Sequence, residues 1–347
     1  MYHIMAIGNA LVDHEYRLTD AQLASTQLKK GNMTLADANQ QQHLLHQLDD
    51  LGLKPSQLMG GGSAANAMYV IASLGSKCHY TCQVGDDDKG TFYLKNLNEA
   101  GVHTSEQAIH QGKITGTCVV CVSDDGERTM QTHLGASSDI DEKNIDFAIL
   151  TDSEWLYFEG YLAMSEQMAP AISKLRQQAC RQNKKIAVSF ADPAVVSVAK
   201  AGLTHMIGNG VDVIFCNLEE AQLFTKQQSV DACVQELLHH CHLAVVTQGG
   251  DGSVIGQKDA DDKTHLTHIN TPVVDKVQDT NGAGDNFAGA FLYALSQGHT
   301  LAQCGKFASH VASQVVQQFG ARLEPLQYQA IAKQVLSQQP TKINIKS

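Results

Sequence analysis

Short runs of β-branched and other apolar residues alternate with longer segments of helical period through most of the chain. Five of these runs are predicted as buried strands: residues 4–7, 155–158, 186–190, 211–216 and 243–247. Strands that alternate with helices form parallel sheets, because a crossover helix returns the chain to the same edge. We therefore predict an α/β fold with a mostly parallel sheet flanked by helices.

Each predicted strand is followed by a turn of polar or small residues. These turns cover residues 8–9, 159–161, 191–193, 217–220 and 248–252. In open α/β sheets, ligands bind beyond the carboxyl ends of the strands. We expect the functional site to be built from these turns.

Two regions interrupt the alternation of strand and helix. Residues 13–18 are predicted as one strand, and residues 115–123 and 128–134 as a hairpin around the polar turn 124–127. No crossover helix joins these strands. We predict a small β lid (residues 13–36 and 113–135) on a large α/β domain (residues 1–12, 37–112 and 136–347) that binds nucleotide and substrate.

Charge and composition narrow the range of partners. The 347 residues include 25 Lys and Arg against 36 Asp and Glu, a formal charge of −11, and no segment concentrates the basic residues. Nucleic acid and anionic membranes are therefore not expected partners. No run approaches the roughly 18 apolar residues of a membrane span, and the first residues lack a basic leader. We expect a cytoplasmic protein whose nine scattered cysteines are reduced.

Two clusters have residue types that bind metals. Cys118 and Cys121 have half of a zinc-site spacing, but they lie in a β-branched run without a turn, which favours a strand. His239, His240 and His242 flank Cys241 at the end of an apolar-periodic segment, which favours a solvated helix end. We predict a metal at neither cluster.

The strongest motif is Asp279-Thr280-Asn281-Gly282-Ala283-Gly284-Asp285. Apolar residues then recur with helical period from Phe287 to Leu295, so the glycines stand at a helix N-terminus. Free amides there, unobstructed by side chains, can hold a phosphoryl group. Asp285 in the first turn could orient a hydroxyl or take its proton. Tight packing of a helix start would also explain the glycines.

A second glycine-rich segment fits two nucleotide-binding patterns incompletely. Gly60, Gly62 and Ala65 have the spacing of a dinucleotide fingerprint, but that fingerprint requires a buried strand before the first glycine, and residues 53–58 are predicted as a proline-bearing loop. No Gly-x-x-x-x-Gly-Lys-Ser/Thr occurs, which excludes a P-loop kinase.

Four motifs in order along residues 1–320 resemble those of the ribokinase (PfkB) family of carbohydrate and nucleoside kinases. They are the Asp279–Asp285 motif, Gly60-Gly61-Gly62-Ser63-Ala64-Ala65-Asn66 with Val84-Gly85-Asp86-Asp87, Asn217-Leu218-Glu219-Glu220, and Thr247-Gln248-Gly249. The resemblance implies a ribokinase-like fold and an ATP-dependent kinase. The opening Gly8-Asn9-Ala10-Leu11-Val12-Asp13 and Asn281, where ribokinases usually carry Thr, are similar to the adenosine kinases of the family.

The resemblance also implies roles for individual residues. The catalytic residues it implies are Asp285 and the backbone amides of Gly282, Ala283 and Gly284. The acceptor is bound by Asp13, Asn9, Gly61, Gly62, Asn66 and Tyr161, with Asp13 accepting from two ribose hydroxyls. Apart from the resemblance, Asp13 could also be a surface charge of the lid strand. Arg128, in the lid hairpin, either reaches the acceptor site and its transferring phosphate or is solvated. ATP is bound by Asn217, Thr247, Gly249, Gly252 and Asn281. Glu220 and Asn217 organise Mg²⁺ through water, and Asp279 and the Asn281 carbonyl match positions that bind K⁺ in some relatives.

Three functions are kept open at this point. The first is transfer of the γ-phosphoryl group of ATP to the 5′-hydroxyl of a nucleoside, with adenosine preferred. The second is a sugar kinase of the same family, since Tyr161 is followed by Leu162 where adenosine kinases commonly carry a second aromatic ring. The third is a phosphate-ligand sensor with vestigial chemistry. In each case the partner is a small molecule, and the protein is a monomer or homodimer.

Overall fold

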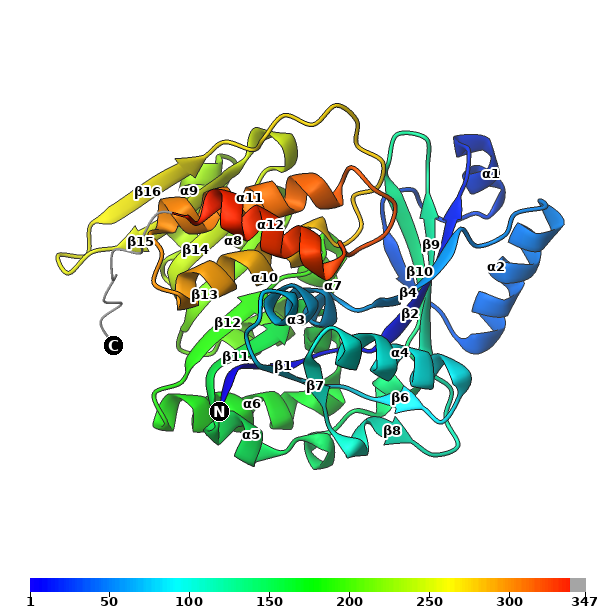
Figure 1. The fold of residues 1–347 in the computed structure, drawn as a ribbon, viewed down its shortest axis with the longest axis horizontal. Helices are drawn as coiled ribbons and strands as arrows, with labels where there is room; N and C mark the ends of the chain where they lie inside the picture. The colour runs from blue at the N-terminus through cyan, green and yellow to red at the C-terminus, as the bar shows by residue number, and fades with distance from the viewer. Residues whose placement is uncertain (338–347) are drawn as a thin grey trace.

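The computed structural model describes residues 1–337, which form a nine-stranded sheet, a five-stranded sheet, a two-stranded sheet of β6 (Val84–Gly85) and β8 (Ile109–His110), and the helices around them (Figure 1). The large sheet has nine strands in the order β16-β15-β14-β13-β12-β11-β1-β5-β7. Its strands are β1 (Tyr2–Ile7), β5 (Cys78–Thr81), β7 (Val102–Thr104), β11 (Ser153–Glu159), β12 (Lys185–Ser189), β13 (Val211–Asn217), β14 (Cys241–Thr247), β15 (Ser253–Lys258) and β16 (Thr264–Ile269). All neighbours are parallel except β14–β15 and β15–β16. The five predicted strands are confirmed.

Helices cover both faces of this sheet, because alternate residues of each strand point to opposite sides. Ile4 and Ala6 of β1 pack in one apolar core, whereas Met5 and Ile7 pack in the other. The helices of the first core are α3 (Ser63–Ser73), α4 (Asp88–Glu99), α10 (Ala283–Ser296), α11 (Leu301–Val315) and α12 (Pro325–Val335). Those of the second are α5 (Phe147–Thr151), α6 (Ala169–Arg181), α7 (Pro193–Ile207), α8 (Leu218–Thr225) and α9 (Val230–Leu237).

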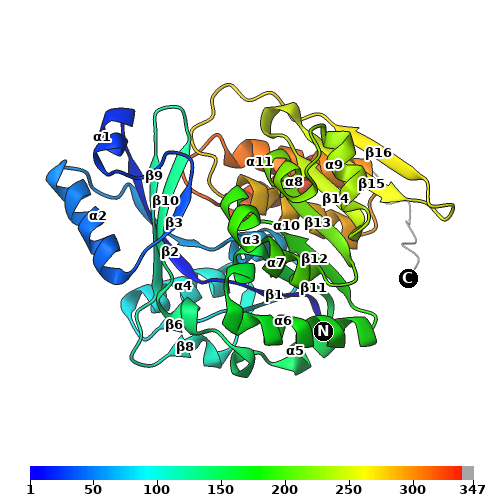
Figure 2. The ribbon, with the colours of Figure 1, turned by 180° about the vertical axis from the view of Figure 1, so that it is seen from behind.

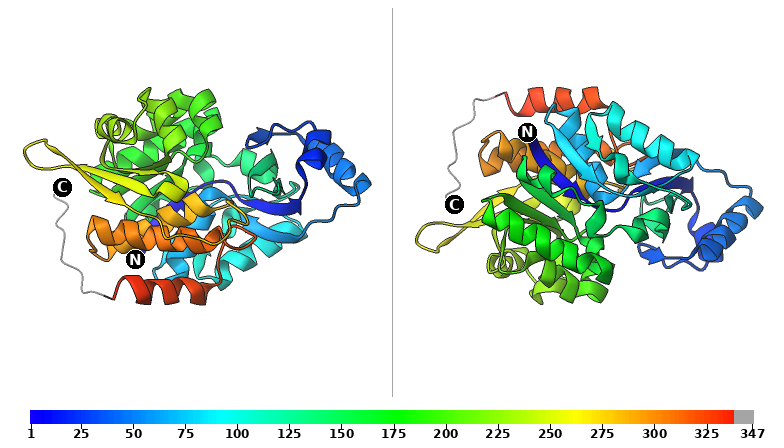
Figure 3. Two further views of the ribbon diagram at one scale, coloured as in Figure 1. Left: turned by 90° about the horizontal axis from the view of Figure 1, so that it is seen from above. Right: turned by 90° about the horizontal axis from the view of Figure 1, so that it is seen from below.

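A five-stranded sheet, which we call the small sheet, stands at one end of the molecule (Figures 1 and 2). Its order is β3-β10-β9-β2-β4, from β2 (Leu11–Arg17), β3 (Met33–Leu35), β4 (Gln57–Gly61), β9 (Gly116–Val122) and β10 (Arg128–His133). Helices α1 (Asp20–Ser25) and α2 (Ala38–Asp50) lie on the side away from the large sheet (Figure 3). The predicted β9–β10 hairpin is confirmed by its antiparallel register.

The small sheet includes more of the chain than the two segments predicted for the lid. Strand β4, which we expected to be a loop of the large domain, pairs antiparallel with β2. Leu44 and Leu48 of α2 pack against Val119 and Cys121 of β9. Local sequence did not reveal β4, because its stability comes from pairing with a strand more than 40 residues earlier, Leu11 with Gly61 among others.

The position of β4 shows whether the dinucleotide fingerprint at Gly60, Gly62 and Ala65 applies. A strand does precede Gly62, but it belongs to the small sheet, whereas the strand after α3, β5, belongs to the large one. The fingerprint needs both strands in one parallel sheet, so it does not apply here.

The two suspected metal clusters are elements of secondary structure. Cys118 and Cys121 are buried in β9, and His239 and His240 follow the end of α9. Within residues 1–337 no three His, Cys, Asp or Glu side chains converge to hold a metal ion, and all nine cysteines are free. No helix in this range is long and apolar enough to cross a membrane.

Candidate active site

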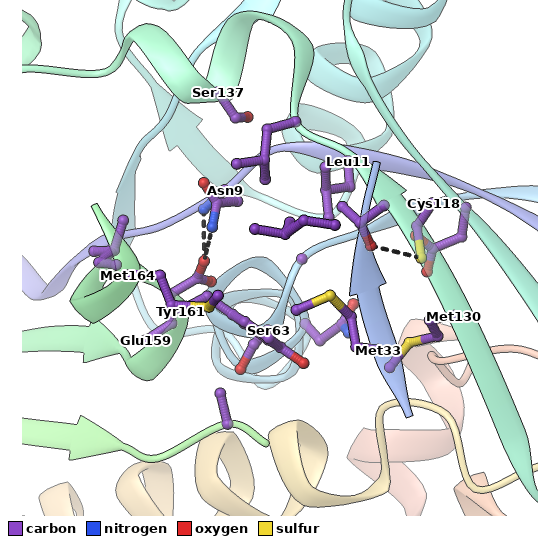
Figure 4. Close-up of a pocket in the computed structure, with 18 of the residues that line it drawn as sticks. Asn9, Leu11, Met33, Ser63, Cys118, Met130, Ser137, Glu159, Tyr161 and Met164 are labelled. Carbon is purple, nitrogen blue, oxygen red and sulfur yellow. Dashed lines mark hydrogen bonds between the residues drawn. The ribbon is translucent and has the colours of Figure 1, made fainter. Parts of the chain in front are cut away.

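A cavity of about 230 Å³ lies between the small sheet and the carboxyl ends of the large-sheet strands. Polar residues form part of its wall: Asn9, Asp13, Ser63, Asn66, Arg128, Thr132, Ser137, Ser138, Glu159, Tyr161, Ser165, Asn281 and Asp285. Apolar and small residues form the rest: Leu11, Met33, Leu35, Gly62, Cys118, Met130, Leu134, Ile140, Leu162, Met164 and Ala191. Figure 4 shows Met33 and Met130 on the opposite side of the cavity from Met164. Seven residues were predicted to bind the phosphoryl acceptor. Six of them line this cavity, and Gly61 does not.

Asp285 is the third residue of α10 and is held by two side chains of α3. Ser63 Oγ donates to Asp285 Oδ1 at 2.6 Å, and Asn66 Nδ2 donates to Oδ2 at 2.9 Å. Burial raises the pKa of Asp285, while these two hydrogen bonds and the charges of Arg128 and Arg322 oppose the rise. The carboxylate therefore has a fixed orientation and faces the cavity.

The first amides of α10 lie at a glycine-rich turn. Gly282 is the N-cap residue, with φ of +72° and no side-chain cap, and a Cβ on it would collide with the Ala321 carbonyl oxygen. Only glycine fits this position without strain. Ala283 follows, and its N–H donates to the Thr280 carbonyl at 3.3 Å. Gly284 comes next and is exposed, so no side chain covers the N–H groups of Gly282 and Gly284 at the helix end beside Asp285. This is the geometry of an anion-binding helix terminus.

Asp13 lies in the middle of β2 and is 6% exposed, which excludes a surface charge. Burial and the nearby Glu15 raise the pKa of Asp13 to about 8, although Arg322, Asn281 and Arg128 lower it. A Cβ on Gly61, on the paired strand β4, would collide with the Asp13 carboxylate. Gly61 thus leaves room for the Asp13 carboxylate, and it is not itself on the cavity wall.

Glu159, at the end of β11, joins three parts of the site. Its Oε1 accepts from the backbone N–H of Asn9 at 2.7 Å and from Asn9 Nδ2 at 2.9 Å (Figure 4). Its Oε2 accepts from the N–H of Ala64 at 2.8 Å, in the first turn of α3. Burial raises the pKa of Glu159 to about 7, against the effect of these N–H donors. The carboxylate caps α3, which has no other side-chain cap.

Asn281 connects the small sheet to the turn before α10. Its Oδ1 accepts from Arg128 Nη1 at 3.0 Å, its Nδ2 donates to Glu15 Oε1 at 3.2 Å, and its N–H donates to Asp279 at 2.8 Å. Asn281 lies on the wall of the cavity, and its predicted contact with ATP stays a prediction. Arg128 is thereby a partly buried member of the site and not a solvated surface cation.

Tyr161 contributes the one aromatic ring on the cavity wall. Its hydroxyl donates to Asp192 Oδ2 across 3.4 Å, and burial raises the pKa of the phenol well above its usual value. The hydroxyl is anchored, so the ring is held in place.

The residues predicted to bind ATP lie at the ends of neighbouring strands. Asn217 and Thr247 are paired across β13 and β14, and Gly249 and Gly252 follow β14. Asn217 and Glu220 form a reciprocal capping box at the start of α8, in which both Glu220 oxygens accept from Asn217. Burial raises the pKa of Glu220 to about 8, although the hydrogen bond from the Asn217 N–H lowers it. Asn217 thus orients Glu220.

Asp279 is fully buried and braces the turn before α10. One oxygen accepts from the N–H of Asn281 and the other from the N–H of Gly320 at 2.9 Å. Both oxygens therefore serve the backbone, and the K⁺ role stays a prediction from the resemblance.

Sequence reasoning missed four polar residues that support the site: Glu15, Ser63, Glu159 and Arg322. Glu159 and Ser63 had a usable signal, since one ends a predicted strand and the other lies inside a recognised motif. Glu15 and Arg322 had none, because an acid in a lid strand and an arginine near the C-terminus resemble solvated residues. Both are buried in the structure.

Comparison with known proteins identifies related kinases. A family model described as pfkB family carbohydrate kinase matches residues 36–327. The adenosine kinase of Saccharomyces cerevisiae is 27% identical over an alignment of 337 residues that covers 91% of this chain and 95% of the yeast protein.

Two solved structures extend the comparison over the whole fold. An adenosine kinase from Sinorhizobium meliloti superposes with a TM-score of 0.88 and 30% identity, covering 96% of this chain and 99% of that one. A probable sugar kinase from Rhizobium etli has the same TM-score, 29% identity, and coverage of 96% and 98%. The ribokinase-like fold predicted from the sequence is confirmed.

Proposed function

The chain belongs to the pfkB family of carbohydrate kinases, and on this premise we propose that it transfers the γ-phosphoryl group of ATP to the 5′-hydroxyl of adenosine, giving AMP and ADP. The observation that carries the choice of acceptor is the mixed wall of the cavity. Asp13, Asn66 and Asp285 supply polar groups for a ribose, and the methionine and leucine side chains supply an apolar surface for a base. A free sugar would leave that apolar surface without a partner.

The acceptor is held through its ribose. The two oxygens of Asp13 accept hydrogen bonds from the adjacent ribose hydroxyls, and Asn66 adds an amide. The base lies against the Tyr161 ring and the apolar wall, where stacking and burial favour a flat heterocycle. Asn9 and Gly62 form the backbone surface around the sugar.

Transfer depends on Asp285 and the start of α10. Asp285 orients the 5′-hydroxyl and takes its proton as the bond to phosphorus forms, since a loose transition state needs a base only late. The amides of Gly282, Ala283 and Gly284 hold the γ-phosphoryl group, and Arg128 adds positive charge from the small sheet. Closure of the cavity keeps water from competing with the hydroxyl.

ATP is bound along the ends of β13 and β14, by Asn217, Thr247, Gly249 and Gly252. Mg²⁺ would be held through water by Glu220, with Asn217 orienting it, since this ion retains most of its water ligands. When bound, Mg²⁺ supplies charge that offsets the ATP phosphates.

The test is ADP release by the purified protein with ATP, Mg²⁺ and a panel of adenosine, inosine, cytidine, ribose and fructose. We expect adenosine to give the largest kcat/KM. A larger value for ribose or fructose would make the protein a sugar kinase, the assignment of the Rhizobium etli relative. If the protein released no ADP with any of these acceptors, the ligand-sensor alternative would remain.

A further inference from the structure

Arg322 is a buried arginine outside the cavity wall. It lies between α11 and α12 and is 6% exposed. Its Nε donates to Asn66 Oδ1 at 2.8 Å, its Nη1 donates to Asn96 Oδ1 at 2.8 Å, and its guanidinium lies 4.8 Å from the centroid of the Tyr69 ring. Burying a guanidinium has a desolvation cost, and these hydrogen bonds end on neutral amides, which offset it less than carboxylates would.

The bond to Asn66 decides which way that amide points. A guanidinium only donates, so Asn66 must turn its oxygen toward Arg322. Its nitrogen then faces the other way, where it donates to Asp285 Oδ2. Without Arg322 the amide could rotate and present its oxygen to the carboxylate, which would repel it. The chain of contacts therefore runs from Arg322 through Asn66 to Asp285.

We propose that Arg322 is a positioning residue for phosphoryl transfer, which holds Asp285 in its productive orientation through Asn66. The inference rests on the proposed function, in which Asp285 takes the proton of the acceptor. Arg322 acts from outside the cavity and needs no contact with either substrate.

Arg322 also acts on Asp285 through its charge. The charged and titratable groups that influence Asp285 come from several elements: Arg128 on β10, Arg322 after α11, Glu159 and Tyr157 on β11, Tyr161 after it, and Glu220 on α8. Among these charged and titratable groups, the two arginines favour the ionised carboxylate, as do the hydrogen bonds from Ser63 and Asn66. Loss of Arg322 removes one of the two arginines and frees the Asn66 amide, and both changes raise the pKa of Asp285.

The experiment compares Arg322→Gln, Arg322→Lys and Asn96→Ala with the unaltered protein, measuring kcat at saturating ATP and adenosine from about pH 5 to 9. In Arg322→Gln we expect kcat to fall by ~10-fold or more, because small displacements of a reacting group are costly. We also expect the acidic limb of the kcat profile to move to higher pH, since activity requires ionised Asp285. The adenosine KM should change less than kcat.

The other two variants separate charge, geometry and stability. Arg322→Lys retains the charge but not the planar fork, so its kcat should fall while its acidic limb moves less than that of Arg322→Gln. Asn96→Ala removes the second partner of Arg322 and should lower stability with little change in kcat or its profile.

A purely structural role predicts another pattern. Arg322→Gln would then be less stable, but its folded fraction would have the kcat and acidic limb of the unaltered protein, and that result would overturn the proposal. If Arg322→Gln does not fold, Arg322→Lys decides, because normal kcat in that variant contradicts a geometric role. Failure of the proposed function would look different, as the unaltered protein itself would release no ADP with adenosine.

Discussion

Asn281 Nδ2 donates a hydrogen bond to Glu15 Oε1 at 3.2 Å, although 266 positions of the chain separate the two residues. Glu15 belongs to the small sheet and Asn281 to the turn that precedes α10. The same asparagine accepts from Arg128, so it connects the small sheet to the helix start at two points. The position of the small sheet and the geometry of the anion-binding amides are therefore linked.

We predict that Asn281→Ala lowers kcat by ~10-fold or more, because Arg128 and Glu15 lose the side chain that joins them to the turn before α10. Glu15→Gln should lower kcat by a smaller factor. Residues that share one network are not additive, so the double variant should lose less than the product of the two factors. Steady-state kinetics of the three variants test this. Strictly multiplicative losses would mean that the contact does not connect the two parts.

Asp285→Asn is predicted to reduce kcat by roughly 10²-fold or more, with ATP affinity nearly unchanged, because a general base contributes about 10²–10⁴-fold. The amide retains the size of the carboxylate but neither its charge nor its ability to take a proton. Single-turnover kinetics and ATP titration by calorimetry provide the two measurements. Near-normal turnover in this variant would remove Asp285 from its proposed role.

Asp13→Ala is predicted to weaken adenosine by roughly 10- to 100-fold and ATP hardly at all. The lost acceptor leaves the ribose hydroxyls unpaired, at a cost of about 1–3 kcal/mol. Separate binding titrations of the two ligands, with circular dichroism as a check on folding, measure the difference. Equal weakening of both ligands would place Asp13 outside the acceptor site.

The same carboxyl group also predicts a pH dependence of stability. Its pKa is about 8 in the folded protein against 3.8 ordinarily, so folding favours the protonated form. Its contribution to the free energy of unfolding is greatest below about pH 4 and is lost as the pH rises toward about 8. Asp13→Asn cannot ionise and should therefore gain stability relative to the unaltered protein as the pH rises.

Thermal unfolding of Asp13→Asn at about pH 5 and pH 8 tests this dependence. The difference in Tm from the unaltered protein should be more positive at the higher pH. Asp261→Asn, at an exposed position in the turn between β15 and β16, is the control and should show the same difference at both pH values. If the Tm difference for Asp13→Asn were the same at both pH values, Asp13 would not be a buried carboxyl group that retains its proton.

Closure of the small sheet on the acceptor is the last prediction. Amide hydrogen exchange in residues 13–18 and 115–134 should slow when adenosine is added and stay unchanged with ATP alone. The reason is that adenosine contacts Asp13 and the apolar wall, whereas ATP lies along the large sheet. Mass spectrometry of peptides from both segments measures the rates. Protection by ATP in the absence of any acceptor would assign these segments to the nucleotide side.

The domain boundaries and the oligomeric state stay predictions from the sequence.

Much of the site was predictable because its signals are local. The strand runs, the glycines at the start of α10 and the position of Asp285 within one helical turn all follow from patterns a few residues long. The period of a strand or helix is set by backbone geometry, and an N-terminal glycine motif carries its chemistry in its own amides. These features need no knowledge of the path of the chain.

Other features were decided only by the tertiary structure. Strand β4 exists because β2 lies beside it, Asn281 lies on the cavity wall because the small sheet reaches over it, and Arg322 matters because Asn66 lies within 2.8 Å. The apolar wall of the cavity likewise combines residues of the small sheet with residues of the segments that follow β10 and β11. Such contacts join residues tens to hundreds of positions apart, and burial changes the chemistry of each side chain, so no local pattern in the sequence could encode them.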